Sequence, residues 1–326
     1  MTALIPIFAQ VAGPTEGHFA AALSEGLALG AIYALLAMGF VIIFKATQVL
    51  NFAHGALSAL GAFLVASFAT LINFPGRFLP ESVPTWLTWT LSAVCALIAA
   101  ALAGMILERI FIRPMVGEEL FAVAIVTLGI DIALRNVTND FIGTDPRPLG
   151  DPWGTQIADF GWITFAHTEI AQILVSVILV SLVAVFFQSK TGIAMRATAF
   201  DQEAARAQGI NVGRIFSISW AIGAVLAAVA GIFISVFPRR SAGVDTFTAF
   251  FAFKALPAII LGGLDSVVGA IIGGFAIGLA EAFVGEYVTF AFLGAGFAGI
   301  VPYLVMLIVL IIRPYGLFGT EEIRRV

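Results

Sequence analysis

Most of the side chains that could do chemistry in this sequence stand inside or beside long apolar runs. Asn51, His54 and Gly55 lie together in QVLNFAHGAL, just before such a run begins. If the run crosses a membrane, a histidine there is costly unless it faces protein or water. One interpretation is a gate in a substrate pathway, where an unwound backbone offers polar groups to a zwitterion. The other is a hydrogen bond between neighbouring helices, which asparagine and histidine often form in membranes.

Three ionisable residues stand deeper in the apolar runs. Asp131 and Arg135 are four residues apart in TLGIDIALRNVTND, so on a helix they share one face and can neutralise each other. We favour a structural ion pair, although the same charges would also suit a clamp on the ammonium and carboxylate of an amino acid. Lys254 precedes Pro257 in FFAFKALP. Its side chain either snorkels to the membrane surface or lies at a helix break, where transporters often place their sites.

The composition requires lipid rather than water around most of the chain. Of 326 residues, 60% are hydrophobic and 11% are charged, against roughly 25% charged in ordinary soluble domains. Mean hydropathy is +1.05. We therefore expect an all-α polytopic membrane protein with a single transmembrane domain over residues 1–326. The first residues, MTALIPIFAQVAG, lack the basic start of a cleaved signal.

Several classes of function are excluded by what the sequence lacks. The net charge is −4 and no basic patch for nucleic acid is present. The single cysteine, Cys95, leaves no disulfide or cysteine metal site within the chain. Walker-type phosphate loops, zinc-ligand spacings and nucleophile elbows are also missing. We expect no catalytic site, no metal, no cofactor and no ATPase site in this chain.

Apolar runs of about 17–25 residues mark the expected spans. Nine such runs lie near 22–44, 53–73, 86–107, 119–141, 169–187, 215–237, 246–263, 266–285 and 297–313. Pro257 lies inside the seventh run, and only two residues separate it from the eighth. A broken or re-entrant helix fits there as well as two complete spans, so about eight to ten transmembrane helices are expected. The glycines of GGLDSVVGAIIGG predict close helix packing.

The distribution of Lys and Arg predicts the orientation of the spans. If segment 188–214 is cytoplasmic, ten of these residues lie inside and four lie outside. The inner residues are Lys45, Arg109, Arg113, Lys190, Arg196, Arg206, Arg214, Arg313, Arg324 and Arg325, and the outer ones are Arg77, Arg147, Arg239 and Arg240. This bias places the N-terminus outside and the C-terminus in the cytoplasm. Glu281 and Glu286 then approach the outer surface, where we expect both to be solvated.

One charged, alanine-rich segment, RATAFDQEAARAQGINVGR, interrupts the apolar runs. Thr198 followed by Asp201 resembles a capping box, which predicts a helix of about ten residues with Thr198 as its N-cap. Asp201 and Glu203 fall in its first turn and Arg206 in its last, as the helix dipole favours. Gly209 follows at the position where a left-handed residue often ends a helix.

This charged helix has two interpretations. Phe200, Ala204 and Ala207 would share one thin side, which suits insertion into the groove of a partner protein. The alternative is a solvated linker with incidental helicity. The whole connection, 188–214, is longer than most connections between elements.

The connection 142–168 is rich in proline and glycine and contains Trp153 and Trp162. Indole rings near a membrane boundary usually anchor at the headgroups, and we favour that role for both residues. A docking surface for an external partner is the other interpretation.

Four stretches carry a resemblance to a known family. EAARAQG (203–209) resembles the E-A-A-x-x-x-G core of the ATPase-contacting loop of ABC importer permeases, although the Ile-x-Leu-Pro ending of the longest motif is missing downstream. Three longer stretches resemble the branched-chain amino-acid ABC permeases, specifically their H-type subunit. They are GLALGAIYALLAMGFVIIFKATQVLNFAHGALSALGAFL (26–64), GINVGRIFSISWAIGAVLAAVAGIF (209–233) and FKALPAIILGGLDSVVGAIIGGFAIGLAEAF (253–283).

The resemblance implies a heteromeric importer of the bacterial inner membrane. This chain and a second, distinct permease subunit would form the pathway, with cytoplasmic ABC ATPase subunits beneath and an external binding protein that delivers substrate. The residues assigned to ATPase coupling are Asp201, Glu203, Ala204, Ala205, Arg206 and Gly209. The pathway candidates are Asn51, His54, Gly55, Asp131, Arg135 and Lys254.

The expected cargo is a branched-chain or other hydrophobic amino acid. Relatives of the family carry urea or short amides, which remain an alternative. A different class, an ion-coupled secondary transporter, would need a carboxylate near the middle of the membrane, and Asp131 is the deepest candidate.

Overall fold

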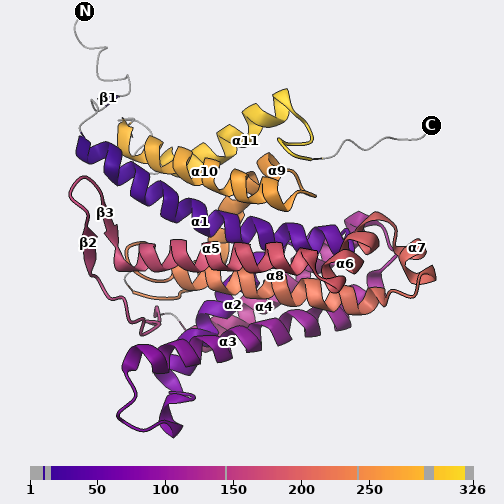
Figure 1. The fold of residues 1–326 in the computed structure, drawn as a ribbon, viewed down its shortest axis with the longest axis horizontal. Coiled ribbons are helices and arrows are strands. Elements are labelled where there is room, and N and C mark those ends of the chain that lie inside the picture. Colours follow the sequence, from indigo (N-terminus) through magenta and orange to yellow (C-terminus); the bar gives the residue numbers. More distant parts are fainter. Residues whose placement is uncertain (1–9, 12–15, 144, 241, 290–296, 320–326) are drawn as a thin grey trace, which may run out of the picture.

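The structure is a computed structural model that describes residues 10–11, 16–143, 145–240, 242–289 and 297–319. Most of the N-terminal stretch expected to carry no signal, together with Arg324 and Arg325 of the charge count, lies outside these ranges. Within them, the chain forms a helical bundle whose long helices run roughly side by side (Figure 1).

Seven of the described helices are long and apolar enough to cross a membrane. They are α1 (Glu16–Thr47), α2 (His54–Ala66), α3 (Thr85–Leu107), α4 (Leu120–Ile142), α5 (His167–Gln188), α8 (Val212–Ile234) and α10 (Val267–Tyr287). Helix α2 continues through the π-helical turn η2 (Ser67–Leu71), and α3 continues through η4 (Glu108–Ile112) and η5 (Arg113–Met115). The all-α polytopic fold is confirmed.

Two shorter apolar helices complete the predicted set of nine runs. The first consists of the 3-10 helix η6 (Thr248–Ala255) followed by α9 (Leu256–Gly262), with Pro257 in the first turn of α9. The second consists of η7 (Phe297–Ile300) and α11 (Val301–Ile312). The predicted discontinuity near Pro257 is therefore present as a change from 3-10 to α-helical backbone, because proline suits only the first turn of a helix.

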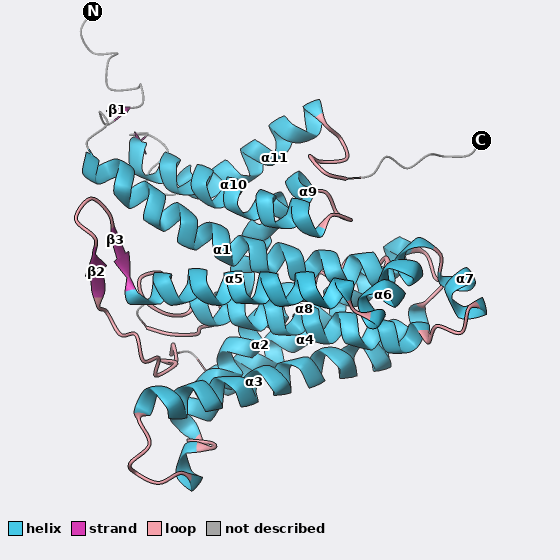
Figure 2. Ribbon diagram, in the orientation of Figure 1, coloured by secondary structure: helices cyan, strands magenta, loops and turns pink. Residues whose placement is uncertain are grey.

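The remaining elements are short and lie at the two ends of the bundle. Strands β2 (Ile157–Asp159) and β3 (Thr164–Ala166) pair antiparallel at one end, which we name the hairpin end (Figure 2). Strand β1 (Gln10–Val11) pairs with β4 (Val288–Thr289). Helices α6 (Lys190–Phe200) and α7 (Gln202–Ala207) lie at the opposite end, the α7 end.

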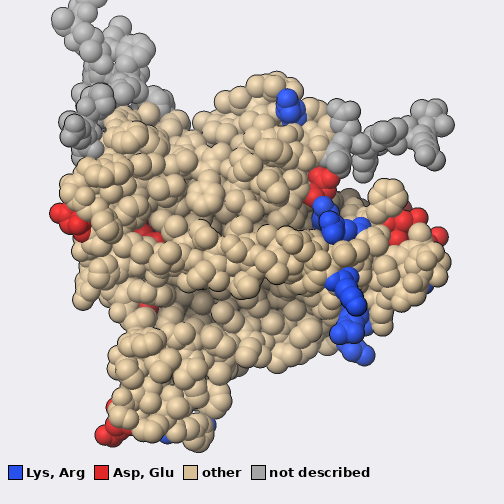
Figure 3. All heavy atoms as spheres, viewed as in Figure 1, with Lys and Arg blue, Asp and Glu red and all other residues tan. Residues whose placement is uncertain are grey.

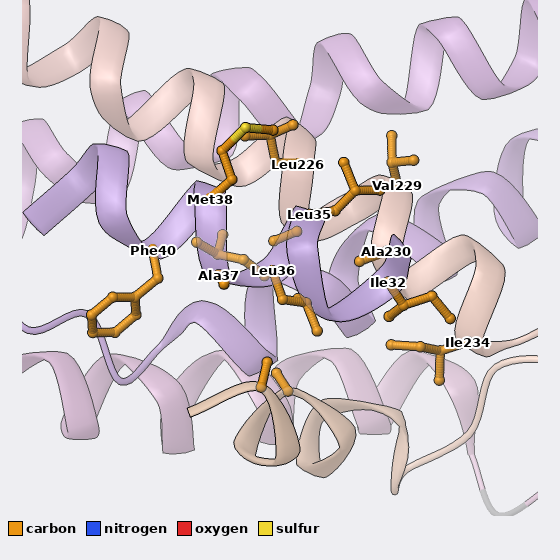
Figure 4. Close-up of a cluster of buried hydrophobic side chains, with 14 of the residues drawn as sticks. Ile32, Leu35, Leu36, Ala37, Met38, Phe40, Leu226, Val229, Ala230 and Ile234 are labelled. Carbon is orange, nitrogen blue, oxygen red and sulfur yellow. The ribbon is translucent and has the colours of Figure 1, made fainter. Parts of the chain in front are cut away.

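Helices α1 and α8 form the centre of the bundle. The most apolar window of α1 is 89% buried, against 17% for α5. Figure 4 shows Met38 and Leu35 of α1 beside Leu226 and Val229 of α8. The outward faces of α3, α4 and α5 expose many leucines and isoleucines. Such faces suit a lipid environment, in which an apolar surface needs no protein cover.

Helix α10 joins α1 and α9 through small residues. A Cβ added at Gly274 or Gly278 would collide with the backbone of α1 at Ala34 or Gly30. On another side of α10, a Cβ at Gly273 would collide with Ala258 of α9. The backbones therefore touch without intervening side chains, and the predicted packing of small residues is confirmed.

The two tryptophans of the long connection differ in their surroundings. Trp153 packs against Trp89 and Phe233, with ring centroids 5.0 and 5.5 Å away. Its ring is half-buried beside these two aromatic partners, so it packs within the hairpin end, and the headgroup anchor stays a prediction for this residue. Trp162 is exposed, as the anchor interpretation requires.

Candidate functional site

Segment 188–214 contains two helices rather than the single one expected from Thr198. Thr198 lies buried inside α6, where its hydroxyl donates to the carbonyl of Ala194 at 2.9 Å. Asp201 is the N-cap of α7 instead, and its Oδ1 accepts from the backbone N–H groups of Glu203 and Ala204 at 2.9 Å each. Aspartate is among the strongest N-caps, whereas threonine within a helix readily bonds back to the preceding turn.

The end of α7 follows the prediction for Gly209, which has a φ of +80°. The N–H of Ile210 donates to Ala205 O at 3.0 Å, closing the left-handed ending. The expected thin side is corrected, however. Phe200 ends α6 on the other side of the Asp201 break, so it does not share a helix with Ala204. Ala205 is the buried residue of α7.

Helix α7 is attached to the bundle through α8. Ala205 forms a small buried cluster with Val212 and Phe216 at the start of α8. The other residues assigned to coupling, Asp201, Glu203, Ala204, Arg206 and Gly209, are exposed. A short helix with an outward polar surface is thus held against the first turns of a central helix.

A polar cluster that the sequence analysis missed holds the start of α8 to the end of α3. Arg113 donates to both carboxylate oxygens of Glu108, from Nε at 3.0 Å and from Nη2 at 2.8 Å. Its Nη2 also lies 2.8 Å from the Gly213 carbonyl, and the Ser217 hydroxyl donates to Glu108 at 2.6 Å. We name Glu108, Arg113 and Ser217 the α3–α8 anchor.

A π-helical turn at the end of α3 explains why Glu108 and Arg113 pair. Glu108 and Arg113 are five residues apart, a spacing that does not place two side chains on one face of an α-helix. The π-helical turn η4 widens the helix at this point and brings the two residues together. Glu108 is fully buried, so its charge depends on the guanidinium beside it.

Residues 48–53 form the unwound segment expected around Asn51. The chain leaves α1 through Gln48 at a φ of +57° and returns into the bundle. The Thr127 hydroxyl of α4 fixes this segment, 2.8 Å from the Leu50 carbonyl and 3.2 Å from the Phe52 nitrogen. Helix α2 therefore begins inside the bundle, with His54 against Phe40 in the middle of α1.

His54 and Asn51 bring unpaired polar groups into this interior position. Among the described residues, neither ring nitrogen of His54 nor Nδ2 of Asn51 has a hydrogen-bond partner of normal geometry. Both line a pocket of about 20 Å³ with Gly55. A pocket of this size holds one water molecule. The structure thus brings the three residues together around a narrow constriction, in which Asn51 and His54 are the polar side chains of a largely apolar lining.

Gly55 has a steric role at this constriction. A Cβ added to it would collide with the carbonyl oxygen of Ala249 in η6. The start of α2 and the 3-10 helix therefore touch backbone to backbone. The absence of a side chain here sets how closely η6 approaches α1 and α2.

Asp131 and Arg135 form the ion pair expected from their spacing. Arg135 Nη2 lies 2.7 Å from Asp131 Oδ2, and the Asp131 side chain is 2% exposed. The guanidinium also covers the ring of Phe250, 4.5 Å from its centroid. Neither charge lines the pocket at His54. This arrangement favours the structural interpretation over a clamp on substrate.

Lys254 does not snorkel freely, because its Nζ lies 2.7 Å from Oε1 of Glu281. The other carboxylate oxygen of Glu281 accepts from the Tyr33 hydroxyl at 2.6 Å. Glu281 is buried, so the expectation that it is solvated is wrong; α1 and η6 cover the side of α10 that carries it. Glu286, also expected to be solvated, pairs with His18.

Three cavities follow one another along α1 and the η6–α9 segment. A cavity of about 500 Å³ at the hairpin end is lined by Leu29 of α1 and Lys254 of η6. The constriction follows, between Phe40 and Ile259. A cavity of about 560 Å³ then opens at the α7 end, beside Lys45. We name the first the outer cavity and the last the inner cavity.

The inner cavity reaches segment 188–214. Arg196 and Phe200 of α6 line it together with Asp265, which stands in the connection between α9 and α10. Lys45 Nζ donates to the Asp265 carbonyl at 3.1 Å. In Figure 3 the Lys and Arg side chains of the visible face gather mainly toward this end of the bundle.

Comparison with known proteins places the chain. The family model described as branched-chain amino acid transport system / permease component matches residues 22–310. The high-affinity branched-chain amino acid transport system permease protein LivH of Escherichia coli K12 is 28% identical over 321 residues, covering 95% of this chain and 98% of LivH. BraD of Pseudomonas aeruginosa is 28% identical, covering 96% of this chain and all of BraD.

Among solved structures, PsaBC from Streptococcus pneumoniae in complex with Fab has a TM-score of 0.44 and 16% identity, with 90% of this chain and 92% of that chain covered. The family assignment rests on the sequence match, which spans most of the chain. The chain is therefore a multi-pass permease component rather than an ATPase, and it belongs to the permease family of the branched-chain amino acid ABC transport systems.

Proposed function

We propose that this chain forms part of the translocation pathway of an ATP-driven importer for branched-chain or other hydrophobic amino acids. The observation that carries the proposal is the line of three cavities along α1 and η6–α9. Two of them are large enough for an amino acid, and the one between them holds only water. This is the arrangement that alternating access needs, with a central gate that is closed in this state.

Asn51, His54 and Gly55 form the gate in this proposal. Their unpaired polar atoms receive a zwitterion or its water as it passes, while the unwound backbone of 48–53 absorbs the movement of α2. Lys254 contributes to the outer cavity through its pairing with Glu281. Asp131 and Arg135 keep α4 in place beside the gate rather than contact the substrate.

Coupling to the ATPase partners is assigned to α7 and its flanks. Asp201, Glu203, Ala204, Arg206 and Gly209 form the surface that a cytoplasmic ABC ATPase subunit holds, and Ala205 fixes that surface to α8. A movement of α7 reaches α8 directly, and the α3–α8 anchor carries it to α3. Nucleotide bound to the ATPase supplies the difference in free energy between the two states.

The remaining partners and the orientation follow from the same proposal. The α7 end faces the cytoplasm and the hairpin end faces outward, with the N-terminus outside, the C-terminus inside and the chain in a bacterial inner membrane. A second, distinct permease subunit completes the pathway. An external binding protein delivers the substrate to the hairpin end, where Trp162 is exposed.

The apolar part of the outer cavity favours an amino acid over urea or a short amide. Leu29, Phe251 and Ala282 line it beside the charged residues, and this wall suits an aliphatic side chain. An ion-coupled mechanism lacks support, because the deep carboxylate it requires, Asp131, is already neutralised by Arg135.

Reconstitution of the complex tests the proposal. This chain is expressed with its candidate second permease and ATPase subunits, purified, and placed in proteoliposomes with the binding protein. We expect uptake of radiolabelled leucine that requires ATP, and little uptake of urea or acetamide. Calorimetric binding of the same ligands to the binding protein identifies the cargo. Uptake by this chain alone, driven by a sodium or proton gradient, would refute the assignment.

A further inference from the structure

The outer cavity is lined by a largely buried guanidinium, that of Arg239, which has only one distant ion-pair partner among the described residues. Arg239 is 11% exposed, yet its best contacts are Nη2 to the Glu25 carbonyl at 3.4 Å and Nη1 to Glu25 Oε1 at 3.8 Å. Its Nε is buried and has no hydrogen-bond partner among the described residues. A largely buried guanidinium whose one ion-pair contact among the described residues is long can accept a further anion.

The neighbouring cations differ from Arg239 in this respect. Lys254, on the same cavity, has a carboxylate oxygen 2.7 Å away. Arg240, the next residue along the chain, pairs with Asp245 and lines a different cavity. The weak pairing is thus particular to Arg239 and does not extend to the other basic residues near this end.

The rest of the lining is suited to a zwitterion. Three carboxylates, of Glu25, Glu169 and Glu281, stand against the two cations Arg239 and Lys254. Glu281 is occupied by Lys254 and Tyr33, whereas the Glu25 carboxylate has only the distant contact with Arg239. A cation that can receive a carboxylate and a weakly paired carboxylate that can receive an ammonium group therefore lie in one cavity.

We propose that the outer cavity is a binding site for a free α-amino acid, in which Arg239 receives the α-carboxylate. The fork of N–H groups in a guanidinium fits a carboxylate in a bidentate manner. Glu25 receives the ammonium group, and the aliphatic side chain lies against Leu29 and Phe251. This inference rests on the proposed function, since it assigns the first site that substrate meets after release by the binding protein.

The test measures binding to the nucleotide-free complex of permease and ATPase subunits, without the binding protein, by isothermal titration calorimetry in nanodiscs. Leucine is compared with leucinamide, which lacks the carboxylate. Hydrogen bonds between charged groups are among the strong ones, so we expect leucine to bind wild type at least about tenfold more tightly than leucinamide.

The variant Arg239→Gln should lower the affinity for leucine and leave that for leucinamide unchanged, so that the preference for leucine disappears. Arg239→Lys keeps the charge without the fork and should retain part of the preference. Arg240→Gln is the matched control, because it removes an adjacent arginine of the other cavity; it should keep the full preference. Thermal unfolding of each complex verifies that the variants are folded.

The inference fails if Arg239→Gln retains the preference for leucine, or if leucine does not bind wild type at millimolar concentration. It also fails if leucine and leucinamide bind wild type equally. These outcomes leave the proposed function intact when ATP-driven leucine uptake with the binding protein persists. Loss of leucine uptake in the wild-type complex would instead refute the proposed function itself.

Discussion

Arg113 at the α7 end and Arg239 at the hairpin end are the same type of residue, but their guanidinium groups differ in how many hydrogen-bond partners they have. Arg113 meets both oxygens of a buried carboxylate and a backbone carbonyl within 3.0 Å. Arg239 has no described partner closer than 3.4 Å and leaves Nε unpaired. A guanidinium whose N–H groups have close acceptors, as in Arg113, joins two helices rigidly. A guanidinium with N–H groups left without acceptors, as in Arg239, remains available to a ligand. The number of hydrogen bonds that each guanidinium makes therefore distinguishes a structural contact from the proposed ligand-binding residue.

The largest difference between the two arginines is expected when each is replaced in turn and the free energy of unfolding is measured. Arg113→Gln leaves Glu108 buried without its cation, which should lower the free energy of unfolding by about 3–5 kcal/mol. Arg239→Gln should not lower it, since the change removes a largely buried charge that has only one distant partner. Thermal or denaturant unfolding of the purified complex in detergent provides the measurement.

The double variant Glu108→Gln/Arg113→Gln serves as the control, because it removes both charges together. It should recover most of the stability lost in Arg113→Gln. Equal destabilisation by the two single arginine variants would show that the number of hydrogen bonds does not distinguish the two arginines.

The next largest effect, on ATP-driven uptake, is expected at the proposed coupling surface on α7, near the α3–α8 anchor. Gly209→Val forces a branched side chain into left-handed backbone, at a cost of about 1–2 kcal/mol. The end of α7 should distort, so that the loaded binding protein no longer stimulates ATP hydrolysis, while the permease still inserts and is purified. Gly209→Asn should retain coupling, because asparagine tolerates this conformation. Normal ATP-driven uptake by Gly209→Val would contradict the role of α7.

Between the two ends, His54 tests whether the constriction takes part in transport. His54→Ala removes the ring from the pocket beside Phe40 and should slow uptake about tenfold, which corresponds to roughly 1.4 kcal/mol. The amount of assembled complex should not change. Uptake at the wild-type rate would show that His54 only fills space between helices.

The smallest effect is expected for the ion pair of Asp131 and Arg135, which lines neither the outer nor the inner cavity. Exchanging the charges, as Asp131→Arg/Arg135→Asp, should keep uptake within about twofold of wild type, because the exchange retains an opposite-charge pair four residues apart on α4. Arg135→Gln alone should be more harmful, since it strands the buried Asp131. If the exchange is as inactive as the single variant, these charges contact the substrate.

The sequence was sufficient for features that depend on local patterns. Apolar runs located the nine apolar helical segments of the described residues, Pro257 located the discontinuity near α9, and Gly209 located the end of α7. Each of these follows from hydropathy or from the backbone preference of one residue. The ion pair of Asp131 and Arg135 followed from the spacing of four residues within a helix.

Contacts between distant segments, departures from regular α-helix and competition between neighbouring helix caps were not predicted. Glu281 appeared solvated because its partners, Tyr33 and Lys254, lie 248 and 27 residues away. Glu108 and Arg113 appeared unrelated because only a π-helical turn brings them together. Thr198 was mistaken for an N-cap because the chain contains a stronger cap, Asp201, three residues later.

The glycine contacts of helix α10 have a consequence for movement of the helices that line the proposed pathway. Helix α10 touches one wall of the pathway, α1, through Gly274 and Gly278, and the other wall, α9, through Gly269 and Gly273. Interlocked leucines would hold such contacts at fixed positions, whereas smooth glycine faces present little resistance to sliding along the helix axes. Small shear displacements of packed helices are a common means of opening and closing a site. In the proposed transport cycle we therefore expect the glycine faces of α10 to let α9 slide past α1 along the helix axes while the three helices stay in contact.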